Sequence, residues 1–80
     1  MNSGRGAIEA LGRAREHLHE AVVGLDNAER YTLWDTNPPM PEHDSEANIK
    51  AAISAIDNAR AELERTLVLR AAFLRKLDDN

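Results

Sequence analysis

The side chains best suited to chemistry in this 80-residue chain are His17 and His19, which flank Leu18. An imidazole serves as a general base, a proton shuttle or a metal ligand. One helix presents two ligands to a metal when they are three or four residues apart, whereas residues two apart point about 160° away from each other. We therefore expect both histidines to face solvent, and the sequence predicts no metal site.

No catalytic centre is indicated by the remaining polar residues. The chain has no cysteine, no phosphate-binding glycine loop and no nucleophile elbow. Asp44 and Ser45 stand directly before a periodic apolar run, where a carboxylate or hydroxyl caps the start of a helix. We interpret Ser45 as a cap rather than a nucleophile, and expect a protein that is not an enzyme and carries no cofactor.

Three arginines are possible anion contacts, namely Arg15, Arg60 and Arg70. They lie on or beside the apolar rows of their helices, where packing alone would favour leucine. A guanidinium group binds carboxylates and phosphates bidentately. One interpretation is a small anionic or nucleotide-like ligand held between subunits. The other is that these arginines pair with Glu64 and Glu20, or extend their charged ends into solvent.

Two long helices and a loop must position these residues. Alanine and leucine are abundant, and the only prolines are Pro38, Pro39 and Pro41. A residue before proline avoids the helical region of the backbone. The sequence predicts one domain, residues 1–80, with a helix over 5–34, a proline-containing loop over 35–44 and a helix over 45–77. The fold class is all-α, an antiparallel two-helix hairpin.

Large apolar residues recur at helical spacing in both segments and predict the surfaces that the helices bury. Folding at residues 39–40 would pair residues whose numbers sum to about 80. This register predicts ion pairs of Arg15 with Glu64, Glu20 with Arg60 and Glu29 with Lys50. The apolar rows expected to meet are Ile8, Leu11, Leu18, Val22 and Leu25 in the first helix, and Ile49, Ile53, Ile56, Leu63, Leu67, Leu74 and Leu77 in the second.

A second, smaller row accompanies the first helix: alanines at seven-residue intervals, which would let a neighbouring helix approach closely. They are Ala7, Ala14, Ala21 and Ala28. The segment from Ala7 to Leu18 also matches the segment from Ala52 to Leu63, residue for residue, in its alanines, large aliphatic residues and one arginine. Either duplication or a shared packing requirement explains this match.

Apolar residues outside these rows predict further contacts, because a helix that is apolar on several faces is usually covered by something more. We expect a second copy to cover them, so that two hairpins form a four-helix bundle. We also expect Pro38, Pro39 and Met40 to fold over Trp34 and Val23. The expected interaction residues are Val23, Tyr31, Trp34 and Met40 near the loop, and Val68, Leu69 and Phe73 near the termini.

The net charge of −4 makes nucleic acid an unlikely partner, because phosphate neutralisation dominates that affinity. Charge is uneven: residues 26–46 carry six acids and one base, while arginines gather toward the termini. No apolar run is long enough to span a membrane, and the absence of cysteine is typical of the cytoplasm.

These features favour a cytoplasmic, homo-oligomeric protein–protein interaction module that acts as adaptor, regulator or inhibitor. The first alternative is the oligomeric binder of a small anionic or nucleotide-like ligand described above. As a second alternative, the expected architecture resembles the Rop-like RNA-binding hairpins, and that resemblance implies RNA binding.

Overall fold

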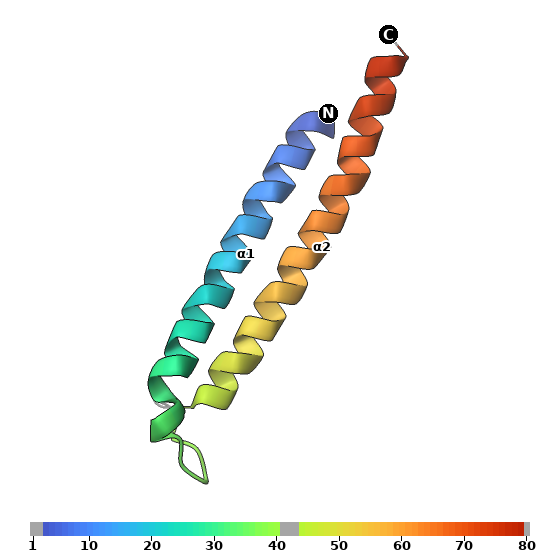
Figure 1. Cartoon of the computed structure of the whole chain (residues 1–80). Helices are drawn as coiled ribbons and strands as arrows, with labels where there is room; N and C mark the ends of the chain where they lie inside the picture. Colours follow the sequence, from blue (N-terminus) through green and yellow to red (C-terminus); the bar gives the residue numbers. More distant parts are fainter. Residues whose placement is uncertain (1–2, 41–43, 80) are drawn as a thin grey trace.

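The protein is a two-helix hairpin (Figure 1). A computed structural model describes residues 3–40 and 44–79, and shows helix α1 over Ser3–Tyr31, a short 3-10 helix η1 over Thr32–Trp34 and helix α2 over Ser45–Asp78. The two long helices run antiparallel and side by side, and the described residues contain no strand. The predicted fold class is confirmed. The molecule is a rod measuring 62 × 16 × 14 Å.

The start of α2 is fixed by two carboxylates. Asp44 is the N-cap residue, and its side chain accepts a hydrogen bond from the Ala47 backbone N–H at 3.0 Å. Asp35, which lies just after η1, accepts a hydrogen bond from the Ser45 backbone N–H at 2.9 Å and another from the Ser45 hydroxyl. Free N–H groups at a helix start require such acceptors. The Asp35 carboxylate therefore closes the loop by tying the end of η1 to the start of α2.

A seam of small residues joins the two helices, and its members recur at alternating spacings of three and four. This is the spacing of an antiparallel coiled-coil contact. Alanine is the commonest seam residue, and every member of the seam is buried or half-buried. The seam consists of Ser3, Ala7, Ala10, Ala14, His17, Ala21, Gly24, Ala28 and Tyr31 in α1, and of Ser45, Asn48, Ala52, Ala55, Ala59, Glu62, Thr66, Leu69 and Phe73 in α2.

The register differs from the one that the sequence predicts. A hydrogen-bonded ion pair joins Arg13 to Glu62, Asn27 donates to the Asn48 side chain at 3.4 Å, and Gly6 lies against Leu69. In all three pairs the residue numbers sum to 75, not 80. The three predicted cross-helix ion pairs are therefore wrong. Arg60 instead pairs with Glu64 at 3.1 Å, and Lys50 with Glu46 at 3.1 Å, each within α2.

The predicted surface of contact between the helices is also wrong. The alanine row, including Ala14, Ala21 and Ala28, faces α2 and is buried, whereas the row of large apolar residues is exposed. The distance between packed helices depends on the side chains at the contact. With alanine and glycine in the seam, the backbones approach closely, as shown by the contact of Gly24 with the Asn48 carbonyl oxygen.

Candidate functional site

The large aliphatic side chains lie in two rows that form an apolar face along the hairpin. Each of them except Leu77 comes one residue after a seam residue, so the row is turned about 100° from the seam. Because α1 and α2 are both right-handed and run in opposite directions, this rotation brings the two rows to the same side of the hairpin. The apolar face consists of Ile8, Leu11, Leu18, Val22, Leu25, Ile49, Ile53, Ile56, Leu63, Leu67, Leu74 and Leu77.

The members of the apolar face are well exposed in the single hairpin. Their exposed fractions run from 39% for Leu74 to 70% for Ile8. Single exposed apolar residues are ordinary, but a contiguous apolar surface along a whole element marks a site of interaction. The face is therefore the main candidate functional site.

The register places residues of like character opposite each other on this face. Because paired numbers sum to about 75, Val22 lies level with Ile53 and Ile8 with Leu67. Leu18 likewise lies level with Ile56, Leu25 with Ile49, and Leu11 with Leu63. The face is thus a ladder of matched apolar rungs, with one residue from each helix.

Two rungs of the ladder are charged. Arg15 and Arg60 form one of them, and Glu29 and Glu46 form the other. Both rungs carry two like charges, and they are separated by fourteen residues of helix, about 21 Å. Between them lie three apolar rungs. The sequence match of residues 7–18 with residues 52–63 follows from this arrangement, since matched residues occupy equivalent places in the seam and on the apolar face.

The expected interaction residues near the loop remain at the surface. The exposed fraction of the Trp34 side chain is 64%, and Val23, Pro38, Pro39 and Met40 are also exposed. The expected packing of Pro38, Pro39 and Met40 over Trp34 and Val23 is therefore wrong, because no buried cluster forms there. Val23 follows Val22, and Val68 follows Leu67, so each is turned about 100° further around its helix and projects away from the apolar face.

Tyr31, Leu69 and Phe73, also expected as interaction residues, lie at the two ends of the seam and are half-buried. A Cβ atom added at Gly6 would lie 3.3 Å from Leu69 Cδ1, so Leu69 fills space against the start of α1. The packing of Leu69 and Phe73 within the hairpin results from the shift in register, which places α2 residues 66–73 beside the start of α1.

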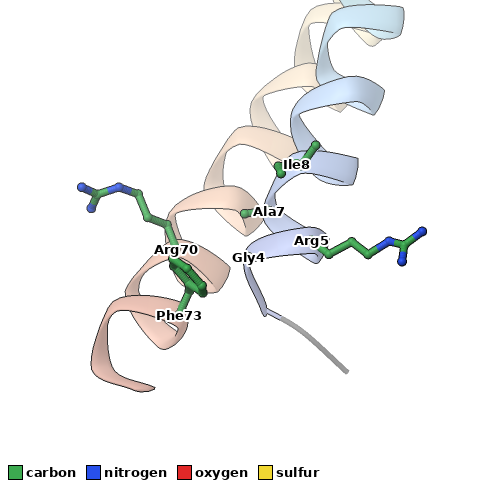
Figure 2. A pocket seen from close by; sticks show the side chains of 6 residues that line it. All are labelled: Gly4, Arg5, Ala7, Ile8, Arg70 and Phe73. Atoms are coloured by element: carbon green, nitrogen blue, oxygen red, sulfur yellow. The ribbon is translucent and has the colours of Figure 1, made fainter. Parts of the chain in front are cut away.

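A shallow hollow of about 430 Å³ lies between the start of α1 and the end of α2. Its lining residues are Gly4, Arg5, Ala7, Ile8, Arg70 and Phe73. Figure 2 shows the side chains of Arg5 and Arg70 extending away from the hollow in opposite directions. The remaining wall is therefore mainly apolar, and it continues the apolar face to the end of the hairpin.

The three arginines proposed as anion contacts do not meet at one point in a single hairpin. Arg15 and Arg60 share a rung, but Arg60 is bound to Glu64. Arg70 lies ten residues further along α2, about 15 Å away. Arg15 lines a second shallow hollow with Glu16, His19 and Glu20, where two carboxylates accompany the guanidinium group.

The two histidines have different surroundings. His19 is exposed, as expected, but His17 is a seam residue whose side chain is 29% exposed. Its Nδ1 atom is buried without a hydrogen bond and lies 3.7 Å from the Glu20 carboxylate. The expectation that His17 faces solvent is therefore wrong. Over residues 3–40 and 44–79, no cluster of three potential metal ligands occurs.

Asp35 is an ionisable group, within residues 3–40 and 44–79, whose pKa the fold changes. The hydrogen bond from the Ser45 hydroxyl, and next the one from the Ser45 backbone N–H, lower the pKa of Asp35 below its usual range. From the sequence, Asp35 was expected only to belong to the loop. The signal available was a carboxylate ten residues before an expected helix start, which by itself does not specify a contact.

Neither α1 nor α2, within the part of the chain described, is apolar and long enough to cross a bilayer. No protein-family model, curated protein or solved structure matches the chain.

Proposed function

We propose that the protein is a non-enzymatic, cytoplasmic interaction module that works as a homo-oligomer, with the apolar face as its contact surface. The observation that carries this proposal is the difference in size and burial between the two rows of residues in each helix. The seam uses side chains such as Ala14 and Ala52, while large aliphatic residues such as Leu18 and Ile53 remain exposed. A soluble hairpin of this design places its largest apolar surface where a second protein can cover it.

The free energies gained by burying small and large side chains support the same conclusion. A buried methyl group contributes about 0.8 kcal/mol, whereas a fully buried leucine or isoleucine side chain contributes about 1.5–3 kcal/mol. The buried apolar residues of the hairpin are all alanines, so most of the available hydrophobic stabilisation lies on the apolar face. Small domains commonly need oligomerisation to reach adequate stability.

A stable homo-oligomer leaves other surfaces for a further partner. The loop end of the hairpin exposes Leu33 and Trp34 of η1, and Met40 of the loop, within the acidic region of residues 26–46. Exposed aromatic residues are favourable anchors in interfaces. In the proposed role as adaptor, regulator or inhibitor, this end of the hairpin contacts the partner protein.

Sedimentation velocity over a range of protein concentrations tests the proposal. A homo-oligomer that dissociates on dilution is the expected result. A chain that remains monomeric at high micromolar concentration would exclude self-association through the apolar face. A thermal-shift screen with nucleotides and inorganic phosphate addresses the sequestration alternative, since a ligand at 100 times its Kd adds about 2.7 kcal/mol of stability.

A further inference from the structure

The positions of the charged rungs define how a second copy would fit on the apolar face. The apolar face between the two charged rungs forms a block, residues 15–29 of α1 and 46–60 of α2, and Val22 and Ile53 are its central rung. Arg15 and Glu29 each lie seven residues from Val22, while Arg60 and Glu46 each lie seven residues from Ile53. Seven residues are two helical turns, about 10.5 Å. The block therefore has an apolar centre, a positive rung at one end and a negative rung at the other.

We infer that two copies stack face to face and antiparallel, about a twofold axis through the rung of Val22 and Ile53. This inference rests on the proposed function and specifies its geometry. Under that axis α1 faces α1 of the second copy, and α2 faces α2. Arg15 then meets Glu29 of the second copy, and Arg60 meets Glu46 of the second copy.

The same twofold axis also brings the apolar rungs of the two copies together. The rung of Leu18 and Ile56 packs against the rung of Leu25 and Ile49 of the second copy, and the central rung packs against itself. Each copy contributes both complementary ends, as a self-complementary twofold interface requires. The antiparallel arrangement also brings the acidic loop region of each copy toward the arginine-rich terminal end of the other.

Other twofold arrangements of the same face do not match its charges. With both loops at the same end, every rung meets its own copy, so arginine faces arginine and glutamate faces glutamate. Antiparallel stacking about the rung of Arg15 and Arg60 gathers four guanidinium groups at the centre. Like charges placed opposite each other in an interface oppose association. The existing pairs of Arg60 with Glu64 and of Lys50 with Glu46 are exposed, so they are weak enough to rearrange.

The size of this interface sets the expected strength of association. The block between the charged rungs is about 21 Å long, and the hairpin is 16 Å wide at its broader cross-section. The area of this block is smaller than the roughly 800 Å² that each partner buries in a standard interface. The dimer should accordingly form in the micromolar range and dissociate on dilution.

Charge reversal tests the inferred register. The Arg15→Glu/Arg60→Glu variant makes both charged rungs negative, and the Glu29→Arg/Glu46→Arg variant makes both positive. Each variant alone should dimerise at least about tenfold more weakly than the unmodified chain, because like charges now meet. An equimolar mixture of the two should associate about as strongly as the unmodified chain. Circular dichroism of each variant checks that helix content is retained.

Crosslinking provides a second measurement that does not depend on charge. The chain has no cysteine, so Val22→Cys introduces a single thiol on the inferred axis, and a short bismaleimide should link two copies efficiently. Leu11→Cys is the matched control, since its two copies would lie about 33 Å apart along the bundle. Linkage of Leu11→Cys at equal or higher yield would overturn the inferred register.

The two measurements separate failure of this inference from failure of the proposed function. If the unmodified chain is monomeric, the homo-oligomer itself is excluded. If the unmodified chain dimerises but the charge-reversed variants associate equally well alone, or fail to associate when mixed, self-association stands and the antiparallel register is wrong.

Discussion

Gly24 of α1 lies directly against the backbone of Asn48 in α2. A Cβ atom added at Gly24 would be 3.0 Å from the Asn48 carbonyl oxygen and 3.3 Å from Ala52 Cβ. Both neighbours belong to α2, and one of them is a backbone atom, so making room for the Cβ atom displaces the helix itself. This contact fixes the closest approach of the two helices and explains why the seam contains small residues.

Gly24→Ala should destabilise the hairpin. Replacing a helical glycine by alanine gains about 1 kcal/mol from helix propensity, but overpacking a tight contact costs about 1–3 kcal/mol. Gly12→Ala is the matched control, because a Cβ atom at Gly12 would have no neighbour within 4 Å. Urea unfolding at one protein concentration should therefore show a gain for Gly12→Ala and a loss for Gly24→Ala. Equal gains would mean that the helices are further apart than described.

Asp35→Asn should weaken the connection between the loop and α2 at neutral pH. The hydrogen bonds from Ser45 favour the ionised carboxylate, so the pKa of Asp35 is lower in the folded chain than in the unfolded chain. A lowered folded pKa contributes stability at pH values above the unfolded pKa of about 4, and that contribution is lost as pH falls through the folded pKa.

The unfolding midpoint of Asp35→Asn should therefore lie below that of the unmodified chain at pH 7. The difference should shrink as the pH is lowered below about 4. Asp57→Asn, on the exposed side of α2, is the control and should change the midpoint little. A difference for Asp35→Asn that is independent of pH would show that the carboxylate charge is not what holds Ser45.

His17→Ala should stabilise the protein more than His19→Ala. Both changes gain up to about 0.7 kcal/mol of helix propensity. Only His17→Ala also removes a buried nitrogen that has no hydrogen bond, and such an atom costs about 1–3 kcal/mol. It also extends the alanine seam by one position. Thermal unfolding of the two variants at equal concentration measures the difference. A lower Tm for His17→Ala than for His19→Ala would mean that the imidazole contributes more through packing than it costs.

The sequence was sufficient to predict the hairpin because the signals for it are local. Helix propensity, the prolines after Asn37 and the capping residue Asp44 each act within a few residues. The observed α1 begins at Ser3 and is continued by η1 to Trp34, and α2 begins at Ser45. These ends differ by at most two residues from the expected starts at residues 5 and 45 and the expected stop at residue 34.

The sequence was not sufficient to identify which apolar row faces the other helix. The row of Leu18 and the row of Ala21 have the same spacing, so periodicity cannot distinguish them. The usual assignment gives the larger residues to the interior. Here the close approach allowed by Gly24 and the alanines reverses that assignment. The alanine repeat was the available signal, and it predicted a close helix neighbour without identifying α2 as that neighbour.

The error in register has the same origin. Pairing residues whose numbers sum to about 80 brings the large rows together, which shifts α2 by five residues relative to the observed seam. The contact of Asp35 with Ser45 contributes to the observed register, because it determines where α2 begins relative to the end of η1. Contacts between residues on either side of a loop cannot be read from spacing alone.

Self-association should use the apolar face and not the surface of α1 that carries Val23. Val22 and Val23 are adjacent, exposed residues of α1; Val22 lies on the apolar face, and Val23 is turned about 100° away from it. Val22→Asp and Val23→Asp therefore make the same chemical change with nearly the same effect on the helix. The decisive measurement is sedimentation equilibrium of both variants beside the unmodified chain. Val22→Asp should be a monomer, and Val23→Asp should form the same oligomer as the unmodified chain. An oligomer retained by Val22→Asp, or lost only in Val23→Asp, would show that the apolar face is not the surface of self-association.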